Sequence, residues 1–319
     1  MRNLCIVMYH YVRNLRHSRY PEIKGLDFEL FRQQIRFLKE NFHIVRMEDV
    51  IEAVRTGKKL PEKAALLTFD DGYADHFTNV FPVLMKEGIQ GSFFISGKTF
   101  VEHKLLDVNK IHFILAAAPV EKLKAELFSL LDHYRGREFS FPSNEELYRE
   151  YGIANRFDDA DVIFAKRILQ TVLPKELRNI ISSRLFEKYI GMSEEAFAYE
   201  LYMSREQIRC MKNCGMHIGL HGYDHYWLGN LNEEDMKRDI KEAHHALQEF
   251  MDSEWVMNYP YGSYNEEVIR AVKEAGGVLG LSTRVSVADL DRDDCYALPR
   301  LDTNDFPPKS ENYKQMWGQ

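Results

Sequence analysis

Three short segments of the sequence combine acidic, imidazole and aromatic side chains in patterns that could do chemistry. The first, LTFDDGY at residues 67–73, sets two carboxylates side by side after a short apolar run. The second, HGYDH at 221–225, holds two histidines four residues apart, and the third, YPYG at 259–262, sets a tyrosine between proline and glycine. Adjacent carboxylates repel each other, and burying them is costly unless a cation or proton compensates. Taken singly, each segment also fits an ordinary turn or surface loop.

Taken together, the three segments supply the groups of a metal-dependent hydrolase. One carboxylate and two imidazoles can bind a divalent metal and leave positions open for water and substrate. A second carboxylate beside the metal ligand is placed to take a proton from that water. This combination suits hydrolysis of an unactivated carbonyl such as an amide or ester. Zn²⁺ is the first candidate for the metal, and Co²⁺, Ni²⁺ or Mn²⁺ would also accept the Asp/His/His set.

In this order the segments resemble the motifs of the polysaccharide deacetylases, the NodB-type carbohydrate esterase family 4. The resemblance extends to MYHYV near the start, to LMKEGIQGSFFI after the first motif, and to GLSTR and ALPRLD near the end. It covers residues 1–100 and 205–302. It implies the distorted (β/α)7 barrel of that family. It also implies an enzyme that removes an acetyl group from an N-acetylated sugar or glycan intermediate.

The resemblance also implies a role for individual residues. Asp71, His221 and His225 would bind the metal. Asp70 would be the catalytic base, and Tyr261 would help to hold the oxyanion through its backbone N–H.

Two departures from the family pattern point to further candidates. Many members have an arginine where this chain has Asn258, and Arg300 is the candidate to orient the base instead. Many members also have a C-terminal histidine as the general acid, which this chain lacks. His10 in MYHYV is the candidate acid, as in a permuted branch of the family, although it could be an ordinary strand-end histidine. We expect its ring across the metal from Asp70. Tyr73 is a candidate to orient or contact substrate.

Hydrophobic periodicity indicates the elements that must position these residues. Strands are expected at 4–9, 64–69, 92–95, 217–220, 255–258, 278–281 and near 296–298. Helices are expected at 28–42, 47–54, 77–87, 205–213, 233–251 and 266–275, with a succession of helical windows between 101 and 204. This alternation predicts a parallel sheet or barrel, with its active site at the carboxyl ends of the strands. We therefore expect a single barrel over 1–319 that carries a helical insertion at 101–204.

The amino-acid composition limits the classes of partner that the protein is expected to bind. The 319 residues hold 42 Lys and Arg against 49 Asp and Glu, a net charge of −7, which argues against binding nucleic acid or anionic lipid. The short apolar run at 4–9 does not fit a signal peptide, and no stretch is long enough to span a membrane. A cytoplasmic location and free cysteine thiols are the resulting expectations.

Other functions stay open at this stage. The same groups could hydrolyse a non-sugar amide or remove a formyl group. The barrel could also be an inactive glycan-binding module, although Asp70, Asp71, His221 and His225 are all present. The helical insertion could serve as an oligomerisation surface or could simply wall the site.

Overall fold

The computed structural model describes residues 2–155 and 158–316. These residues form two compact units. The barrel unit comprises residues 2–14, 25–104 and 199–316, and the helical unit comprises 15–24 and 105–198 apart from the two residues between the described ranges. Within the described ranges, no helix combines the length and the apolar character needed to cross a membrane.

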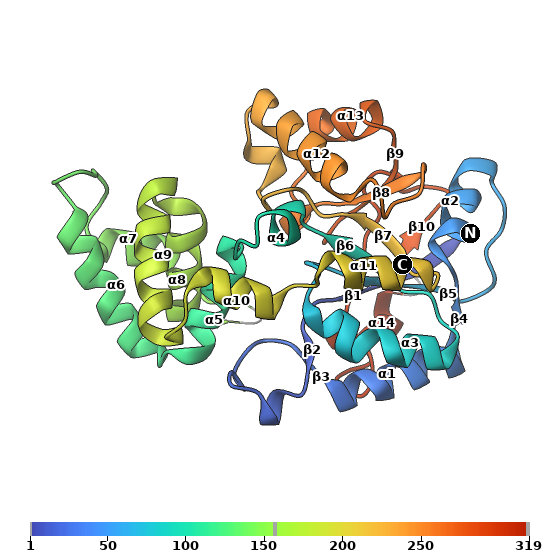
Figure 1. The fold of residues 1–319 in the computed structure, drawn as a ribbon, viewed down its shortest axis with the longest axis horizontal. Coiled ribbons are helices and arrows are strands. Elements are labelled where there is room, and N and C mark those ends of the chain that lie inside the picture. Colours follow the sequence, from blue (N-terminus) through green and yellow to red (C-terminus); the bar gives the residue numbers. More distant parts are fainter. Residues whose placement is uncertain (1, 156–157, 317–319) are drawn as a thin grey trace. The chain divides into compact units, whose positions relative to one another are not determined.

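Six parallel strands form the body of the sheet in the barrel unit (Figure 1). In spatial order they are β1 (Asn3–Tyr9), β5 (Ala64–Phe69), β6 (Ser92–Ile95), β7 (His217–Leu220), β8 (Trp255–Asn258) and β9 (Gly277–Leu281). The short strands are β4 (His43–Ile44) on β5, β10 (Ala288–Asp289) and β11 (Leu301–Asp302) on β1, and the separate pair β2 (Val12–Arg13) and β3 (Leu26–Asp27). The predicted α/β class with its distorted parallel barrel is confirmed.

Helices alternate with these strands, as the periodicity predicted. The barrel unit contains α1 (Phe28–Asn41), α2 (Met47–Thr56), α3 (Phe81–Glu87), α4 (Gly97–Val101), α11 (Arg205–Asn213), α12 (Glu233–Leu247), α13 (Glu266–Glu274) and α14 (Tyr313–Met316). The Asp27 side chain caps α1 by accepting a hydrogen bond from the Glu29 N–H. Gly57 ends α2 in the left-handed conformation at φ 78°, which glycine adopts without strain.

Side chains alternate across the sheet and divide its core in two. Val7 and Leu67 pack with the helices in one hydrophobic cluster. Their neighbours Ile6 and Leu66 belong to a second cluster on the other face, the barrel interior. The same alternation carries Asp70, four residues after Leu66, to the interior face, where it is 1% exposed. The strand period therefore buries this carboxylate.

The barrel closes through residues 298–302. Leu298 forms an isolated bridge with Leu281 of β9, and Leu301 pairs with Val7 of β1. The predicted strand near 296–298 is wrong, because only this single bridge forms before Pro299, which has no N–H for a ladder. Arg300 lies between the two points of closure, and its side chain is fully buried.

The helical unit packs around its own apolar core. Its helices are α5 (Asp107–Ala117), α6 (Val120–Tyr134), α7 (Asn144–Tyr151), α8 (Ala160–Arg167) with a π-type continuation at Ile168–Val172, α9 (Lys175–Ile190) and most of α10 (Glu194–Leu201). Ser143 and Glu146 form the capping box at the start of α7. Residues 15–24 join this unit, with Tyr20 packed edge-on against Phe113, so the unit differs from the expected 101–204 boundaries.

Candidate active site

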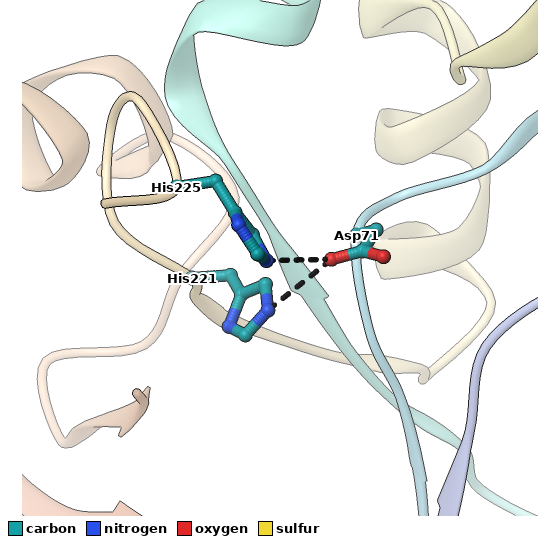
Figure 2. A group of neighbouring side chains, drawn as sticks. All are labelled: Asp71, His221 and His225. Carbon is teal, nitrogen blue, oxygen red and sulfur yellow. Dashed lines mark ion pairs between the residues drawn. The ribbon is translucent and has the colours of Figure 1, made fainter. Parts of the chain in front are cut away.

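The three predicted metal ligands lie together where their strands end (Figure 2). Asp71 follows β5, and His221 begins the loop after β7 that also carries His225. One donor atom from each residue lies within 4.8 Å of the others, and the Nε2 atoms of both histidines are 3.2 Å from Oδ1 of Asp71. All three residues are buried.

The protonation of this cluster indicates what it can hold. The Nδ1 of His221 lies 2.7 Å from the backbone carbonyl of Asn258, an acceptor, so Nδ1 carries the proton and Nε2 presents a lone pair. The facing Oδ1 of Asp71 is buried and has no hydrogen-bond partner among the described residues. Lone pairs that converge in this way need a cation between them. The cluster therefore fits a divalent metal.

When no metal is bound, protons on the imidazoles can supply the positive charge that the Asp71 carboxylate needs. Burial raises the pKa of Asp71, but the interactions with the His221 and His225 imidazoles outweigh burial and hold this pKa well below its usual range. The second carboxylate oxygen, Oδ2, accepts a hydrogen bond from the Tyr73 hydroxyl. Burial and the neighbouring Asp71 charge raise the pKa of Tyr73, so its hydroxyl stays a donor.

Three site residues hold a strained backbone. Asp71, His225 and Tyr261 have φ angles of 75°, 53° and 57°, in the left-handed region that non-glycine residues rarely adopt. Each such residue costs about 1–3 kcal/mol, so it persists only where its surroundings fix it. Clustering of this strain at the carboxyl edge of the sheet is typical of a functional site.

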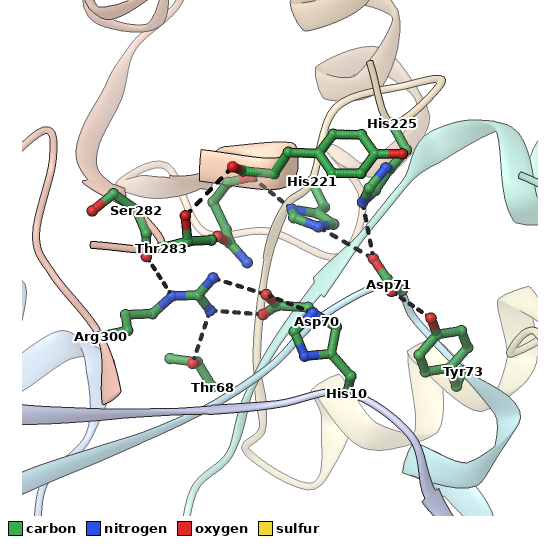
Figure 3. A network of polar contacts seen from close by, with 12 residues as sticks. His10, Thr68, Asp70, Asp71, Tyr73, His221, His225, Ser282, Thr283 and Arg300 are labelled. Atoms are coloured by element: carbon green, nitrogen blue, oxygen red, sulfur yellow. Dashed lines mark hydrogen bonds and ion pairs between the residues drawn. The ribbon is translucent and has the colours of Figure 1, made fainter. Parts of the chain in front are cut away.

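Asp70, the neighbour of the ligand Asp71, belongs to a different network (Figure 3). Both of its carboxylate oxygens accept hydrogen bonds of 2.8 Å from the Arg300 guanidinium. Arg300 also donates to the Thr68 hydroxyl and to the Ser282 carbonyl. Burial raises the pKa of Asp70, but the charges of Arg300 and His10 outweigh burial and hold this pKa well below its usual range. The carboxylate therefore stays ionised.

His10 lies at the end of β1, next to Asp70. As expected, β1 and β5 are neighbours, with Tyr9 paired to Phe69. The Nε2 atom of His10 is 3.7 Å from Oδ2 of Asp70, and the side chain is 40% exposed. The ring thus lies against Asp70 itself, whereas we expected it on the opposite side of the metal from Asp70. Its exposure leaves it open to a substrate that approaches from solvent.

The two tyrosines of the sequence analysis have different environments. Tyr73 is fully buried, so the idea that it contacts substrate is wrong, and its hydroxyl instead supports Asp71. Tyr261 is partly exposed, and its ring stacks on Trp227 at 4.3 Å with an interplanar angle of 6°. The same ring meets the edge of His225 at 4.6 Å. A flat aromatic pair therefore borders the ligand cluster.

Sequence reasoning missed one residue that holds the site. Asp239 of α12 is buried, and its carboxylate accepts hydrogen bonds from the backbone N–H groups of Tyr223 and Asp224. A signal was present, because Asp239 lies among Met236, Ile240 and other apolar residues on the buried face of this helix. A charged residue at such a position is rarely buried without a partner.

The arrangement combines groups that hydrolysis of an amide requires. It holds an ionised carboxylate fixed by an arginine, a three-residue site for a divalent metal, and an exposed histidine beside the carboxylate. A base, an electrophile site and a candidate acid thus meet at one edge of the sheet.

Comparison with known proteins agrees with this chemistry. The family model described as "Polysaccharide deacetylase" matches residues 57–129 and 151–279. A stretch of 54 residues is 52% identical to poly-beta-1,6-N-acetyl-D-glucosamine N-deacetylase of Escherichia coli (strain K12). That stretch is 17% of this chain and 8% of the length of the E. coli enzyme.

Solved structures share the fold over the whole chain. The deacetylase PplD of Streptococcus pyogenes superposes with a TM-score of 0.60 at 17% identity, covering 99% of each chain. IcaB from Ammonifex degensii superposes with a TM-score of 0.55 at 20% identity, covering 99% of this chain and 97% of its own. At these identities the likeness establishes the fold.

Proposed function

This chain belongs to the polysaccharide deacetylase family, and on that premise we propose that it removes an acetyl group from an N-acetylated sugar by metal-assisted hydrolysis. The observation that carries the proposal is the pairing of two adjacent buried carboxylates with different partners. Asp70 is neutralised by Arg300, whereas Asp71 faces two histidines across a gap that suits a cation.

Asp71, His221 and His225 would hold the metal, with Zn²⁺ as the first candidate. A divalent metal there would lower the pKa of water and polarise the amide carbonyl. The carbonyl of Asn258 keeps His221 in the tautomer that offers Nε2 as a ligand. The Tyr73 hydroxyl orients the carboxylate of Asp71.

Asp70 is the proposed general base. It takes a proton from the attacking water as the water oxygen bonds to the carbonyl carbon. Arg300 keeps Asp70 ionised and fixes its plane through two parallel hydrogen bonds. His10 is the proposed general acid, which protonates the nitrogen as the carbon–nitrogen bond breaks. The products are acetate and an amine.

The substrate class follows from the surroundings of the site. Trp227 and Tyr261 form a stacked, partly exposed pair beside His225, the kind of surface on which a sugar ring packs. The E. coli relative is named for an N-acetylglucosamine polymer. We therefore propose N-acetylglucosamine units as the substrate, and Tyr261 as the residue whose backbone N–H helps to hold the oxyanion.

The proposal is tested by acetate release. Purified protein is loaded with Zn²⁺, Co²⁺, Ni²⁺ or Mn²⁺ and incubated with β-linked N-acetylglucosamine oligomers, with sugar nucleotides, and with formylated and non-sugar amides. Acetate from an N-acetylated sugar is expected, and Asp70→Asn should lower the rate by about 10²–10⁴-fold. Turnover of only the non-sugar or formyl compounds would reassign the substrate. Sugar binding without any turnover would make the barrel a binding module.

A further inference from the structure

The two histidines of the ligand cluster are held by different means. The His221 ring is fixed by its own hydrogen bond, from Nδ1 to the Asn258 carbonyl. The Nδ1 of His225 is buried and has no hydrogen-bond partner among the described residues. Metal-binding histidines almost always have such a partner, because it sets both the tautomer and the ring direction. Something other than a ring hydrogen bond must therefore direct His225.

The ring contacts of His225 do not by themselves set its direction. Its neighbours are aromatic edges, with Tyr261 at 4.6 Å and His221 at 4.8 Å between ring centroids. Such contacts are worth about 0.5–1.5 kcal/mol and give Nδ1 of His225 no hydrogen-bond acceptor that would fix the tautomer. His225 also has a φ of 53°, a conformation that the loop must impose on it. The direction of the ring thus depends on the backbone that precedes it.

The backbone of residues 221–223 is held on one side by hydrogen bonds to its carbonyl groups. The Ser96 hydroxyl donates to the His221 carbonyl at 2.9 Å, and the first residues of α4 continue the pattern. The N–H groups of Gly97 and Lys98 donate to the carbonyls of Gly222 and Tyr223 at 3.1 and 3.0 Å.

On the other side, one buried carboxylate holds the N–H groups. Oδ1 of Asp239 accepts from Tyr223 at 2.9 Å, and Oδ2 accepts from Asp224 at 3.0 Å. Gly222 allows this approach, because a Cβ there would lie 3.0 Å from Oδ1 of Asp239. Asp239 is 5% exposed, so its charge is compensated by these two backbone groups.

We propose that Asp239 is a positioning residue for the metal ligand His225. Its two oxygens fix the peptide groups of residues 223 and 224, and these fix the strained backbone from which the His225 ring reaches the metal site. The inference rests on the proposed metal site and goes beyond it, because it assigns the direction of one ligand to a residue of α12.

The test compares Asp239→Asn with wild type and with Glu242→Gln. The asparagine keeps the shape but offers only one acceptor to two N–H donors. Glu242 lies on the same helix at an exposed position, so its substitution removes the same charge but leaves both hydrogen bonds to Asp239 in place. Titration calorimetry with Zn²⁺ should show a Kd raised about 10–100-fold in Asp239→Asn and unchanged in Glu242→Gln. The visible spectrum of the Co²⁺-loaded Asp239→Asn protein should also shift, because the ligand geometry changes.

A merely structural role would lower the melting temperature and leave the Kd and the Co²⁺ spectrum of the folded protein unchanged, which would overturn the inference while the metal site stands. Failure of the wild type to bind metal would overturn both. Hydrogen exchange on the unmodified, metal-free protein gives a second test, independent of any variant. The amides of Tyr223 and Asp224 should exchange slowly. Exchange at the rate of an open surface loop would contradict their hydrogen bonds to Asp239.

Discussion

The site has two halves, which join at the adjacent residues Asp70 and Asp71. Each half compensates the charge of a buried carboxylate in a different way. The base half consists of Asp70, Arg300, Thr68 and His10, and the ligand half consists of Asp71, Tyr73, His221 and His225 (Figure 3). Both aspartates are buried to a similar extent, at 1% and 2% exposure. In the base half an arginine of the chain itself balances the carboxylate. In the ligand half the facing groups are two imidazoles.

The difference shows how one pair of neighbours can perform two tasks. The pairing with Arg300 holds the pKa of Asp70 well below its usual range, so this carboxylate is ionised at neutral pH and can accept a proton. A buried carboxylate that faces imidazole lone pairs attracts a cation. Backbone geometry separates the two, because Asp70 continues the strand ladder through its N–H to Tyr9, whereas Asp71 turns away at φ 75°.

The largest expected effect is on the ligand half alone. His221→Ala or His225→Ala should remove the bound metal, because two remaining ligands cannot hold it, and activity should fall to the level of metal-free protein. Elemental analysis measures this directly. Full metal occupancy in either variant would show that the substituted histidine is not a metal ligand, and the ligand half would no longer be defined by metal binding.

The next largest effect is on the exposed member of the base half. His10→Ala should keep the metal and lower kcat on an amide by about 10²–10⁴-fold. The loss should be smaller on an ester with a good leaving group, which needs little protonation. His245→Ala, at an exposed position of α12, is the control. Equal losses on amide and ester would leave His10 without the role of acid.

A smaller effect on activity, and a larger one on stability, is expected in Arg300→Met. Asp70 would be left buried without its partner, which costs about 3–5 kcal/mol of unfolding free energy. Its pKa would rise, so the acid limb of kcat/KM should move to higher pH. The surface pair of Arg284 and Asp293 provides the control, since Arg284→Met should cost about 1 kcal/mol or less. If the acid limb did not move, Arg300 would not be the group that holds the base Asp70 ionised.

The stability of Arg300→Met should also depend on pH in a defined direction. The folded-state pKa of Asp70 lies below its ordinary value of 3.8, so the pair stabilises the fold above that value. The stabilisation is lost as the pH falls through the folded-state pKa. Urea unfolding should therefore show a full gap between wild type and variant at neutral pH that narrows under acid conditions. A gap that widened under acid conditions would contradict the pairing.

The smallest expected effect is that of chelation on stability. At a free metal concentration of about 100 times Kd, binding adds about 2.7 kcal/mol to the unfolding free energy. A chelator should remove this gain from wild type and from Asp70→Asn, and it should not change the melting temperature of His221→Ala. A chelator effect that disappeared in Asp70→Asn would place the metal in the base half.

Local patterns in the sequence were sufficient for much of the fold and for most of the ligand half. The strands at 64–69 and 217–220 end where predicted, because apolar runs and turn residues define them. The metal ligands follow these strand ends directly, so parallel neighbouring strands bring them together. Asp70 and Asp71 were therefore singled out as a pair by their place in the chain, whereas the family resemblance distinguished the metal ligand Asp71 from the base Asp70.

Long-range contacts were beyond the reach of the sequence. Arg300 was only a candidate, because its contact with Asp70 depends on how residues 298–302 close the barrel from 230 positions away. The burial of Tyr73 follows from aromatic packing against Tyr11 and Tyr202, which no local period indicates. The joining of residues 15–24 to the helical unit likewise depends on contacts between segments far apart in the sequence.

The division of work between the two neighbouring aspartates is tested most directly by the metal content of two matched variants. Asp70→Asn and Asp71→Asn change adjacent residues in the same way, and elemental analysis after loading with Zn²⁺ and gel filtration gives the bound metal per chain. The account predicts full occupancy in Asp70→Asn and loss of the metal in Asp71→Asn. Retention of the metal by Asp71→Asn together with its loss from Asp70→Asn would reverse the two roles, and equal occupancy in both would contradict the division.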